Sequence, residues 1–445
     1  MKLKTSQYNF FFEADDGYTL AYNALSNSLA RVHREKFKLI KKILKAPNKF
    51  SFDTEDKEKL KKDLLKGYFL IDETLSELEI LKMRNKIGRY SKEYLGLAIA
   101  PTLACNFDCT YCFEDKKPDT MTEETENALI KFVESRLELA KLFSVTWFGG
   151  EPTLKIDTIE RLTKSFQKLC EKNNVDFAPM SMITNGYLLT RENAKKLKEL
   201  NIASAQVTVD GPPEVHDKRR KLNNGKGTFV RILENIKAAM DILKIQIRIN
   251  IDKENVETVE ELYKIFKEYG FIDRVPFYFG HVEALTHACT DVSTLCLSTK
   301  EYSAIVIDLL KKSKEKGLLS YRYPSLSHFG FCSADKFNAY VVAPSGLLYK
   351  CWNEISFTKE YSVGSVFEEN LSPQQINNLT KYLNWDPFEN KKCVKCKLFP
   401  VCVGGCPYNA INNRKSENCI DFKYNLNEML RFKYDEIKMK QKTKQ

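Results

Sequence analysis

The sequence from residue 101 to residue 114 reads Pro101-Thr-Leu-Ala-Cys105-Asn-Phe-Asp-Cys109-Thr-Tyr-Cys112-Phe-Glu114. This stretch directly follows an apolar run, residues 94–100, that predicts a strand. Three thiolates at the spacing C-x3-C-x2-C can hold three corners of an iron–sulfur cubane and leave the fourth iron without a protein ligand. A structural zinc ion needs four ligands, and the nearest histidine is the distant His33. The loop therefore predicts an iron–sulfur cluster with one open iron.

Strands and helices alternate from about residue 94 to residue 315. Strands are predicted at residues 94–100, 143–148, 181–184, 204–209, 245–251 and 275–282. Helices are predicted at residues 123–139, 156–171, 191–200, 229–243, 256–269 and 301–315. Such alternation indicates an α/β fold with a parallel sheet and right-handed crossovers. Since six units are too few for a complete eight-stranded barrel, we expect an open, partial (β/α)6 barrel with its chemistry at the carboxyl ends of the strands.

The segments before and after the barrel differ from it in pattern. Residues 1–90 contain a predicted hairpin of residues 8–14 and 18–23, then helices at 33–45, 54–66 and 73–86, with a strand at 67–71. This order predicts a small winged-helix-like module. After Phe331 the alternation stops, and hairpin-like segments at 339–342 and 347–351 precede a cysteine-dense, loop-rich region of the kind that metal usually holds together. The predicted domains are the module at 1–90, the barrel at 91–320, the cysteine-rich domain at 321–430 and a basic tail at 431–445.

Composition excludes several classes of protein. The 445 residues are 43% hydrophobic and 29% charged, an ordinary globular mixture rather than a disordered or fibrous one. No run approaches the roughly 20 apolar residues of a membrane span, and the first residues lack the apolar core of a secretory signal. The net charge of +11 is spread along the chain, so nucleic-acid binding is not expected. We expect a cytoplasmic enzyme.

The 13 cysteines are the most informative count. An odd number without an export signal favours metal or redox chemistry over disulfides. A second group beyond the barrel comprises Cys332, Cys351, Cys393, Cys396, Cys402, Cys406 and Cys419. A zinc ribbon is the structural alternative, but seven ligands are too many for one zinc ion and the spacing is not that of a ribbon. Cys170, Cys289 and Cys296 stand alone and are expected to be buried as small apolar residues.

The first cysteine loop resembles that of radical S-adenosylmethionine (SAM) enzymes, and the resemblance covers about residues 94–320. It implies that the open iron binds the amino and carboxylate groups of SAM, and that an electron from the cluster cleaves SAM into methionine and a 5′-deoxyadenosyl radical. Tyr111 matches the family position that lies near adenine. The segment Gly149-Gly150-Glu151-Pro152 is similar to the family's GGEP motif, whose backbone meets the methionine amine.

Three more polar residues are similar to family positions that contact the ribose or the methionine carboxylate of SAM. They are Asn185, Thr208 and Arg219, and the resemblance implies that Arg219 pairs with the carboxylate. No catalytic residue beyond the cofactor-binding set is predicted.

The second cysteine group closely resembles the SPASM domain of radical SAM peptide-modifying enzymes, which holds two auxiliary [4Fe–4S] clusters. The resemblance implies that the distal cluster is bound by Cys393, Cys396, Cys402 and Cys419. It implies that the proximal cluster is bound by Cys332, Cys351 and Cys406, which leaves that cluster one protein ligand short. The gap of 12 residues before Cys419 is shorter than is typical of the family. The missing ligand is His328, Cys289 or Cys296, or the iron is open to a substrate cysteine.

Two enzyme functions are implied by these resemblances. The first is maturation of a ribosomally synthesised peptide through a Cys thioether or a carbon–carbon cross-link, since the N-terminal module looks like a leader-recognition domain that binds its leader as an added strand. The alternative is an anaerobic sulfatase-maturing type enzyme that oxidises Cys or Ser to formylglycine. In that group the SAM cysteines usually lie near the chain start, so Cys105 argues against it. The complete cysteine loop and the GGEP-like segment disfavour a non-catalytic iron–sulfur electron carrier.

The cofactors implied are SAM and three [4Fe–4S] clusters, one for SAM and two auxiliary. The partners implied are a precursor peptide with its leader and an electron donor such as flavodoxin or ferredoxin.

Overall fold

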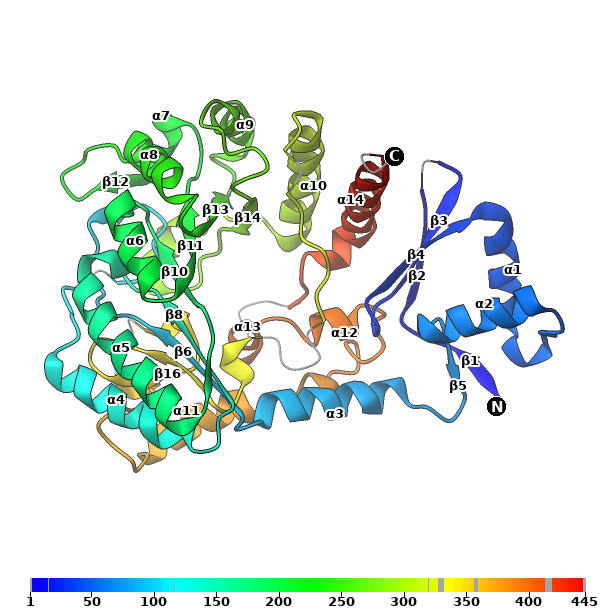
Figure 1. Ribbon diagram of the computed structural model, residues 1–445, viewed down its shortest axis with the longest axis horizontal. Coiled ribbons are helices and arrows are strands. Elements are labelled where there is room, and N and C mark those ends of the chain that lie inside the picture. Colours follow the sequence, from blue (N-terminus) through cyan, green and yellow to red (C-terminus); the bar gives the residue numbers. More distant parts are fainter. Residues whose placement is uncertain are drawn as a thin grey trace. The chain divides into compact units, whose positions relative to one another are not determined.

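The computed structural model describes residues 2–14, 16–115, 117–318, 320–326, 332–355, 359–412 and 418–442 (Figure 1). The chain divides into two compact units, each assembled from separate segments. Unit 1 comprises residues 1–89, 321–332 and 386–445, and unit 2 comprises residues 90–320 and 333–385. The four predicted domains follow chain order and stay predictions. His328 lies outside the described residues.

Unit 2 is built on one large sheet with a parallel core (Figure 1). The core strands are β6 (Tyr94–Ile99), β8 (Leu142–Trp147), β10 (Met180–Thr184), β11 (Ile202–Thr208), β13 (Lys244–Ile251) and β14 (Phe277–His281). Each pairs in parallel with the next. No described strand joins β14 back to the start, so this sheet is open. The predicted α/β fold is confirmed, and the open parallel core is consistent with the predicted partial barrel.

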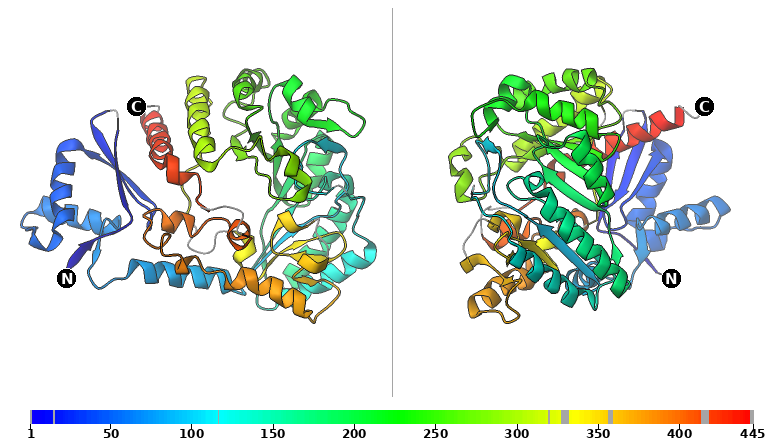
Figure 2. Two further views of the ribbon diagram at one scale, coloured as in Figure 1. Left: turned by 180° about the vertical axis from the view of Figure 1, so that it is seen from behind. Right: turned by 60° about the vertical axis from the view of Figure 1, so that its left-hand side comes forward.

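Helices alternate with these strands, as predicted. They are α4 (Glu123–Leu137), α5 (Ile156–Asn173), α6 (Arg191–Glu199), α8 (Phe229–Ala239), α9 (Val259–Glu268) and α10 (Thr299–Glu315), and the short α7 (Pro213–Arg219) was not predicted. Thr122 ends the turn before α4 and accepts a hydrogen bond from the N–H of Thr125, which fixes where that helix begins. Helices α4 and α5 lie side by side along the sheet (Figure 2).

Three further strands extend the sheet beyond β6. Strand β15 (Ala339–Val342) pairs in parallel with β6, and β16 (Leu347–Tyr349) and β17 (Gly364–Ser365) continue in antiparallel fashion. The predicted hairpin is confirmed as β15–β16, but its pairing with β6 was not predicted because a hairpin pattern does not say which sheet it joins. Cys351 follows β16 and therefore lies in the unit that carries the first cysteine loop. The two-residue β9 (Asp176–Phe177) pairs with β8, and α11 (Pro373–Asn384) ends this part of the chain.

The N-terminal part of unit 1 is a small α/β arrangement. Strands β2 (Asn9–Glu13), β3 (Tyr18–Asn23) and β4 (Ser28–His33) form an antiparallel sheet in that order, and β1 (Leu3–Thr5) pairs with β5 (Leu70–Asp72). The helices are α1 (Arg34–Lys45), α2 (Glu55–Lys66) and α3 (Glu77–Tyr90). The predicted hairpin and three helices are confirmed. Two strands were not predicted: β1, which is only three residues long, and β4, which exposes Ala30 and Arg31 and lacks a continuous apolar face.

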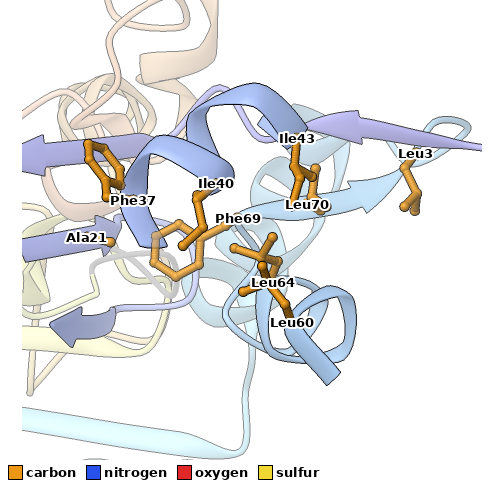
Figure 3. Close-up of a cluster of buried hydrophobic side chains, with 9 residues drawn as sticks. All are labelled: Leu3, Ala21, Phe37, Ile40, Ile43, Leu60, Leu64, Phe69 and Leu70. Carbon is orange, nitrogen blue, oxygen red and sulfur yellow. The ribbon is translucent and has the colours of Figure 1, made fainter. Parts of the chain in front are cut away.

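An apolar cluster holds α1 and α2 against these strands (Figure 3). Helix α1 contributes Phe37, Ile40 and Ile43 at spacings of three residues, and Leu60 and Leu64 from α2 face them. On the other face of the sheet Tyr434 of α14 (Phe422–Lys442) packs with Leu20. The sheet is therefore covered by helices on both faces.

The cysteine-rich end of unit 1 contains little regular structure before α14. Its short helices are α12 (Phe399–Cys402) and α13 (Pro407–Ile411). The predicted basic tail is helical in its described part, up to Lys442. No helix within the described ranges is both long and apolar enough to cross a membrane.

A buried polar network fixes the start of the chain against the hairpin. The side-chain nitrogen of Asn23 lies within 3.0 Å of Ser6 Oγ, Asn9 Oδ1 and the carbonyl of Tyr68. Its oxygen accepts the N–H groups of the next turn, and Glu77 accepts from Ser6 and from the N–H of Gln7. Buried polar groups of this kind stabilise a fold only when all their partners are present.

We predict that Asn23→Ala lowers the free energy of unfolding by about 2 kcal/mol, because it leaves buried donors and acceptors unpaired. Urea unfolding followed by circular dichroism measures the change. Asn377→Ala, at an exposed position of α11, is the control and should change stability by less than about 0.5 kcal/mol. Equal effects of the two substitutions would contradict the prediction.

Candidate active site

The carboxyl ends of the parallel strands carry most of the residues that the sequence motifs indicated. The first cysteine loop follows β6, the two glycines and Glu151 follow β8, and Asn185 follows β10. Thr208 is the buried last residue of β11. Because neighbouring parallel strands end at one edge of a sheet, these residues share that edge, where open α/β sheets bind ligands.

The three thiols of the first cysteine loop influence one another's ionisation. Burial raises the pKa of Cys105 to about 12, the N–H of Phe107 at 3.4 Å opposes this rise, and Glu151 and Cys109 add to it. Burial also raises the pKa of Cys112 to about 12, and Glu114, Cys109 and Cys105 contribute further. Crowded thiols with raised pKa values become thiolates readily only when a metal cation binds them.

Backbone-to-backbone contact between two loops requires both glycines after β8. Gly149 has a φ of +113°, and a Cβ at that position would lie 2.4 Å from the carbonyl oxygen of Thr102. A Cβ on Gly150 would lie 2.4 Å from the carbonyl oxygens of Leu103 and Ala104. The N–H groups of Gly150 and Glu151 donate to Thr102 and Ala104. Both glycines are therefore needed for the close contact with the cysteine loop. The ligand contact that the resemblance implied for them stays a prediction.

The carboxylate of Glu151 joins two strand ends. One oxygen accepts hydrogen bonds from the N–H of Thr153 at 3.0 Å and the hydroxyl of Thr184 at 2.7 Å, and the other accepts from the N–H of Asn185 at 2.7 Å. Burial raises the pKa of Glu151, and these donors oppose the rise. Its carboxylate therefore positions the loop after β8, and contact of Glu151 with SAM stays a prediction.

Asn185 connects the end of β10 to the cysteine loop. Its side-chain nitrogen donates to Asn106 Oδ1 at 2.8 Å and lies 3.9 Å from the sulfur of Cys105. The end of this strand is therefore in contact with the first cysteine.

Tyr111 is the centre of a buried polar network. Its hydroxyl donates to the carboxylate of Asp210, and accepts from Arg220 Nη1 at 2.7 Å and Asn250 Nδ2 at 3.1 Å. Burial raises the pKa of Tyr111, so the phenol is neutral. The other oxygen of Asp210 accepts the N–H of Asn250 at 3.0 Å, which links the ends of β11 and β13.

Arg219 lies in the same network but is paired within the protein. Its two Nη atoms donate to Asp252 at 3.1 and 2.7 Å in a bidentate arrangement. Its Nε is buried without a hydrogen-bond partner among the described residues, 3.8 Å from Asp210. Since Asp252 occupies the guanidinium fork, the predicted pairing of Arg219 with the carboxylate of SAM stays a prediction.

Arg220 was not predicted as a site residue. Strand β12 (Arg220–Leu222) pairs with β7 (Phe107–Cys109), and the register places Arg220 opposite Cys109. The side chain is 8% exposed, and its Nε has no hydrogen-bond partner among the described residues. Burial disfavours the charged form of Arg220, but the electrostatic effects of Cys109 and Tyr111 outweigh burial and raise its pKa well above the ordinary value. Only the pairing of two short strands, for which the sequence gives little signal, reveals this contact.

His216 also lies beside this network. The imidazole accepts the N–H of Asp210 at Nδ1 and faces Thr228 at Nε2. Burial lowers its pKa well below the ordinary value, helped by Arg220 and Arg219. His216 is therefore a neutral residue that positions Asp210.

These residues fit an iron–sulfur cluster and an anionic ligand. The donor set is three thiols from one loop, and thiolates are the usual ligands of such clusters. Arg219 and Arg220 each have a buried Nε with no hydrogen-bond partner in the described part of the chain, and such donors suit a negatively charged group. Within the described ranges, no three Cys, His, Asp or Glu side chains converge tightly enough to hold a single metal ion.

Four cysteines of the second group lie together in unit 1. Burial raises the pKa of Cys402 to about 12, and a hydrogen bond from the N–H of Ile420 partly opposes this rise. The neighbouring Cys393, Cys419 and Cys396 raise the pKa further. These four are the residues that the resemblance assigned to the distal cluster. That they bind a cluster stays a prediction.

A strained turn at residues 403–405, between Cys402 and Cys406, contacts Asn418, the residue before Cys419. Val403 has a φ of +42°, and Gly404 and Gly405 follow with φ of +83° and +79°. A Cβ on Gly405 would lie 2.1 Å from the carbonyl oxygen of Asn418, whose side chain donates to the carbonyls of Gly404 and Cys406 at 2.8 Å. A positive φ is unfavourable for a β-branched residue, so these contacts must hold the turn.

The remaining cysteines are distributed between the units. Cys332 and Cys406 belong to unit 1 and Cys351 to unit 2, so a cluster shared by these three stays a prediction. Cys170 and Cys289 are buried, and Cys296 is half-buried. Cys289 packs with Val282 in an apolar cluster of unit 2, as expected, and the half-buried Cys296 lies at the edge of this cluster. All 13 cysteines are described, and no disulfide joins any of them.

Residues 99–318 match the model of the radical SAM superfamily. A cysteine-type anaerobic sulfatase-maturating enzyme from Clostridium novyi is 27% identical over 345 residues, which cover 71% of this chain and 88% of that protein. The radical SAM cyclopropyl synthase TigE from Paramaledivibacter caminithermalis is 21% identical over 456 residues, 91% of this chain and 89% of that protein.

The fold is also similar to that of SuiB from Streptococcus suis in its crystal structure with the precursor peptide SuiA. The TM-score is 0.52 at 15% identity, over 94% of this chain and 98% of SuiB. The match of residues 99–318 to the family model and the three thiols at the carboxyl ends of a parallel sheet identify the chain as a radical SAM enzyme, similar in sequence to a sulfatase-maturating enzyme and to a cyclopropyl synthase.

Proposed function

We propose that this radical SAM enzyme modifies a ribosomally synthesised precursor peptide and forms a Cys thioether or a carbon–carbon cross-link. The observation that carries the proposal is the combination in one chain of the cysteine loop at the strand ends, the second set of four neighbouring thiols, and an N-terminal sheet with an edge strand. SuiB, whose fold matches nearly the whole chain, binds a precursor peptide in its crystal structure.

Three thiolates, Cys105, Cys109 and Cys112, hold the first cluster in this proposal. When bound, the cluster and SAM supply a 5′-deoxyadenosyl radical that abstracts a hydrogen atom from the peptide. The chain's own residues would bind the cofactors and orient the peptide. The glycine-rich loop after β8 packs against the cysteine loop, Tyr111 and Asp210 form one wall of the site, and Arg220 places a buried positive charge beside the thiolates.

Two auxiliary clusters would supply an acceptor for the electron released in the reaction or a binding position for the substrate sulfur. Cys393, Cys396, Cys402 and Cys419 bind the distal cluster. Cys332, Cys351 and Cys406 would bind the proximal one, and its position without a protein ligand would be available to a cysteine of the peptide. A flavodoxin or ferredoxin supplies the first electron.

Formylglycine formation is the second candidate, favoured by the sequence similarity to the sulfatase-maturating enzyme. That alignment covers 71% of this chain, whereas TigE aligns over 91% of it. Mass spectrometry of a modified Cys-containing peptide separates the two reactions, because a thioether keeps the sulfur whereas conversion of Cys to formylglycine removes it.

Replacing Cys105, Cys109 and Cys112 together with Ala should reduce the formation of 5′-deoxyadenosine to background, because no thiolate remains to hold the first cluster. Chromatography of anaerobic reactions with dithionite and SAM measures the product. Cys170→Ala, at a buried cysteine of α5 that belongs to neither cysteine group, is the control and should keep its activity. If the triple variant still cleaves SAM, the assignment of the cluster is wrong.

We expect Arg220→Gln to slow assembly of the first cluster roughly three- to tenfold, because loss of one buried positive charge raises the pKa of the neighbouring thiols. Iron and sulfide content during anaerobic reconstitution measures the rate. Arg231→Gln, at an exposed position of α8, removes the same charge and should have no effect. Equal rates for Arg220→Gln and the unchanged protein would exclude this role.

A peptide that contains Cys should perturb the electron paramagnetic resonance spectrum of the auxiliary clusters if the proximal cluster has an open iron. The same peptide with Ser in place of Cys is the control and should leave the spectrum unchanged. Modification of the Cys peptide without any spectral change would rule out direct sulfur ligation.

A further inference from the structure

A pocket of about 470 Å³ lies in unit 1, and none of the residues that line it belongs to the first cysteine loop or to its polar network. Its walls come from β1 and β2, from α1, and from the segment 395–397. Phe11 and Leu44 provide half-buried apolar surface in this pocket, and the buried Asn9 provides polar surface. A cavity of this size holds several side chains of a bound peptide.

The pocket is strongly basic. Lys41 and Lys45 project from α1, and Lys395 and Lys397 come from the cysteine-rich segment. All four are exposed, none forms an ion pair with a described acidic residue, and no acidic residue is among those that line the pocket. Four positive charges around one cavity favour a ligand with several negative charges.

The same pocket borders the open edge of β2. The N–H of Ala24 donates to the carbonyl of Tyr8, and the N–H of Ala14 donates to the carbonyl of Tyr18. The alternation of an antiparallel ladder therefore turns the main-chain groups of Asn9, Phe11 and Glu13 away from β3. An edge with outward N–H and C=O groups is a template for another strand.

Cationic side chains occupy the two ends of this edge. Lys397 Nζ donates to the carbonyl of Asn9 at 3.5 Å, and Arg431 Nη2 donates to the carbonyl of Glu13 at 2.7 Å. No hydrogen bond to the main chain of Phe11, between them, is found among the described residues. An added strand would take over the carbonyl of Asn9 and leave Lys397 available for a carboxylate.

We propose that this pocket, which we call the lysine pocket (Lys41, Lys45, Lys395 and Lys397), binds an acidic segment of the precursor peptide as a strand beside β2. The inference rests on the proposed function in that the substrate is a peptide. In an extended strand, acidic residues at alternate positions point to one face and meet the lysines together. Main-chain hydrogen bonds supply affinity, and the four lysines select for carboxylates. Because these lysine–carboxylate pairs are exposed to solvent, salt weakens them.

The test uses fluorescein-labelled 12-residue peptides in which threonine alternates with glutamate or with glutamine. Anisotropy titrations with the full-length, anaerobically reconstituted protein measure both dissociation constants at low and at physiological salt. We expect the glutamate peptide to bind about tenfold more tightly at low salt, since several weak pairs act together, and to lose most of that preference as salt rises. Equal affinity of the two peptides would overturn the proposal.

Two matched variants locate the effect. Replacing Lys41, Lys45, Lys395 and Lys397 with Gln should remove the preference for glutamate. Replacing Lys59, Lys62, Lys66 and Lys86 with Gln removes the same charge from exposed positions of α2 and α3. This variant should keep the preference for the glutamate peptide. If both variants lose the preference equally, net charge and not the pocket is responsible.

Two further measurements distinguish peptide recognition from small-anion binding and from the radical chemistry. Displacement of the peptide by inorganic phosphate, but not by sodium chloride of equal ionic strength, would identify a small-anion site and overturn the proposal. Formation of 5′-deoxyadenosine by the same preparations tests the proposed chemistry separately. The lysine-pocket variant should retain SAM cleavage without peptide, which distinguishes loss of recognition from loss of the reaction.

Discussion

The candidate active site depends on the close approach of two backbones. The cysteine loop after β6 and the glycine pair after β8 lie so near each other that side chains at Gly149 and Gly150 would overlap carbonyl oxygens of residues 102–104. This contact fixes the cysteine loop at the strand ends, and Glu151 then connects the pair to β10 through Thr184 and Asn185. The position of the three thiols follows from main-chain packing more than from side-chain interactions.

Much of this arrangement could be predicted from the sequence, because its signals are local. Alternating apolar periodicity located all six core strands and the main helices, and the spacing of cysteines located both groups. Features that depend on long-range pairing could not be predicted in this way. The position of Arg220 beside Cys109 results from two three-residue strands, and the fork of Arg219 is filled by Asp252, some thirty residues later. No local pattern encodes either contact.

The two compact units divide the predicted machinery in an unexpected manner. Sequence order suggested a recognition module, a barrel and a cysteine-rich domain, but unit 1 combines the first of these with residues 321–332 and 386–445. Within unit 1, the loop that carries Cys396 also contributes two lysines to the lysine pocket, and Lys397 contacts the edge strand β2. Peptide recognition and an auxiliary cluster would therefore share one short segment of chain.

The insertion of β15 next to β6 has a consequence for synthesis of the protein in the cell. Strand β6 is complete at Ile99, but the strand that covers its second edge begins only at Ala339. While the ribosome makes the intervening residues, a nascent chain that has already assembled its parallel core presents an apolar edge with unpaired main-chain groups. Chaperones that shield such edges would thus be needed most between completion of β14 and emergence of β15.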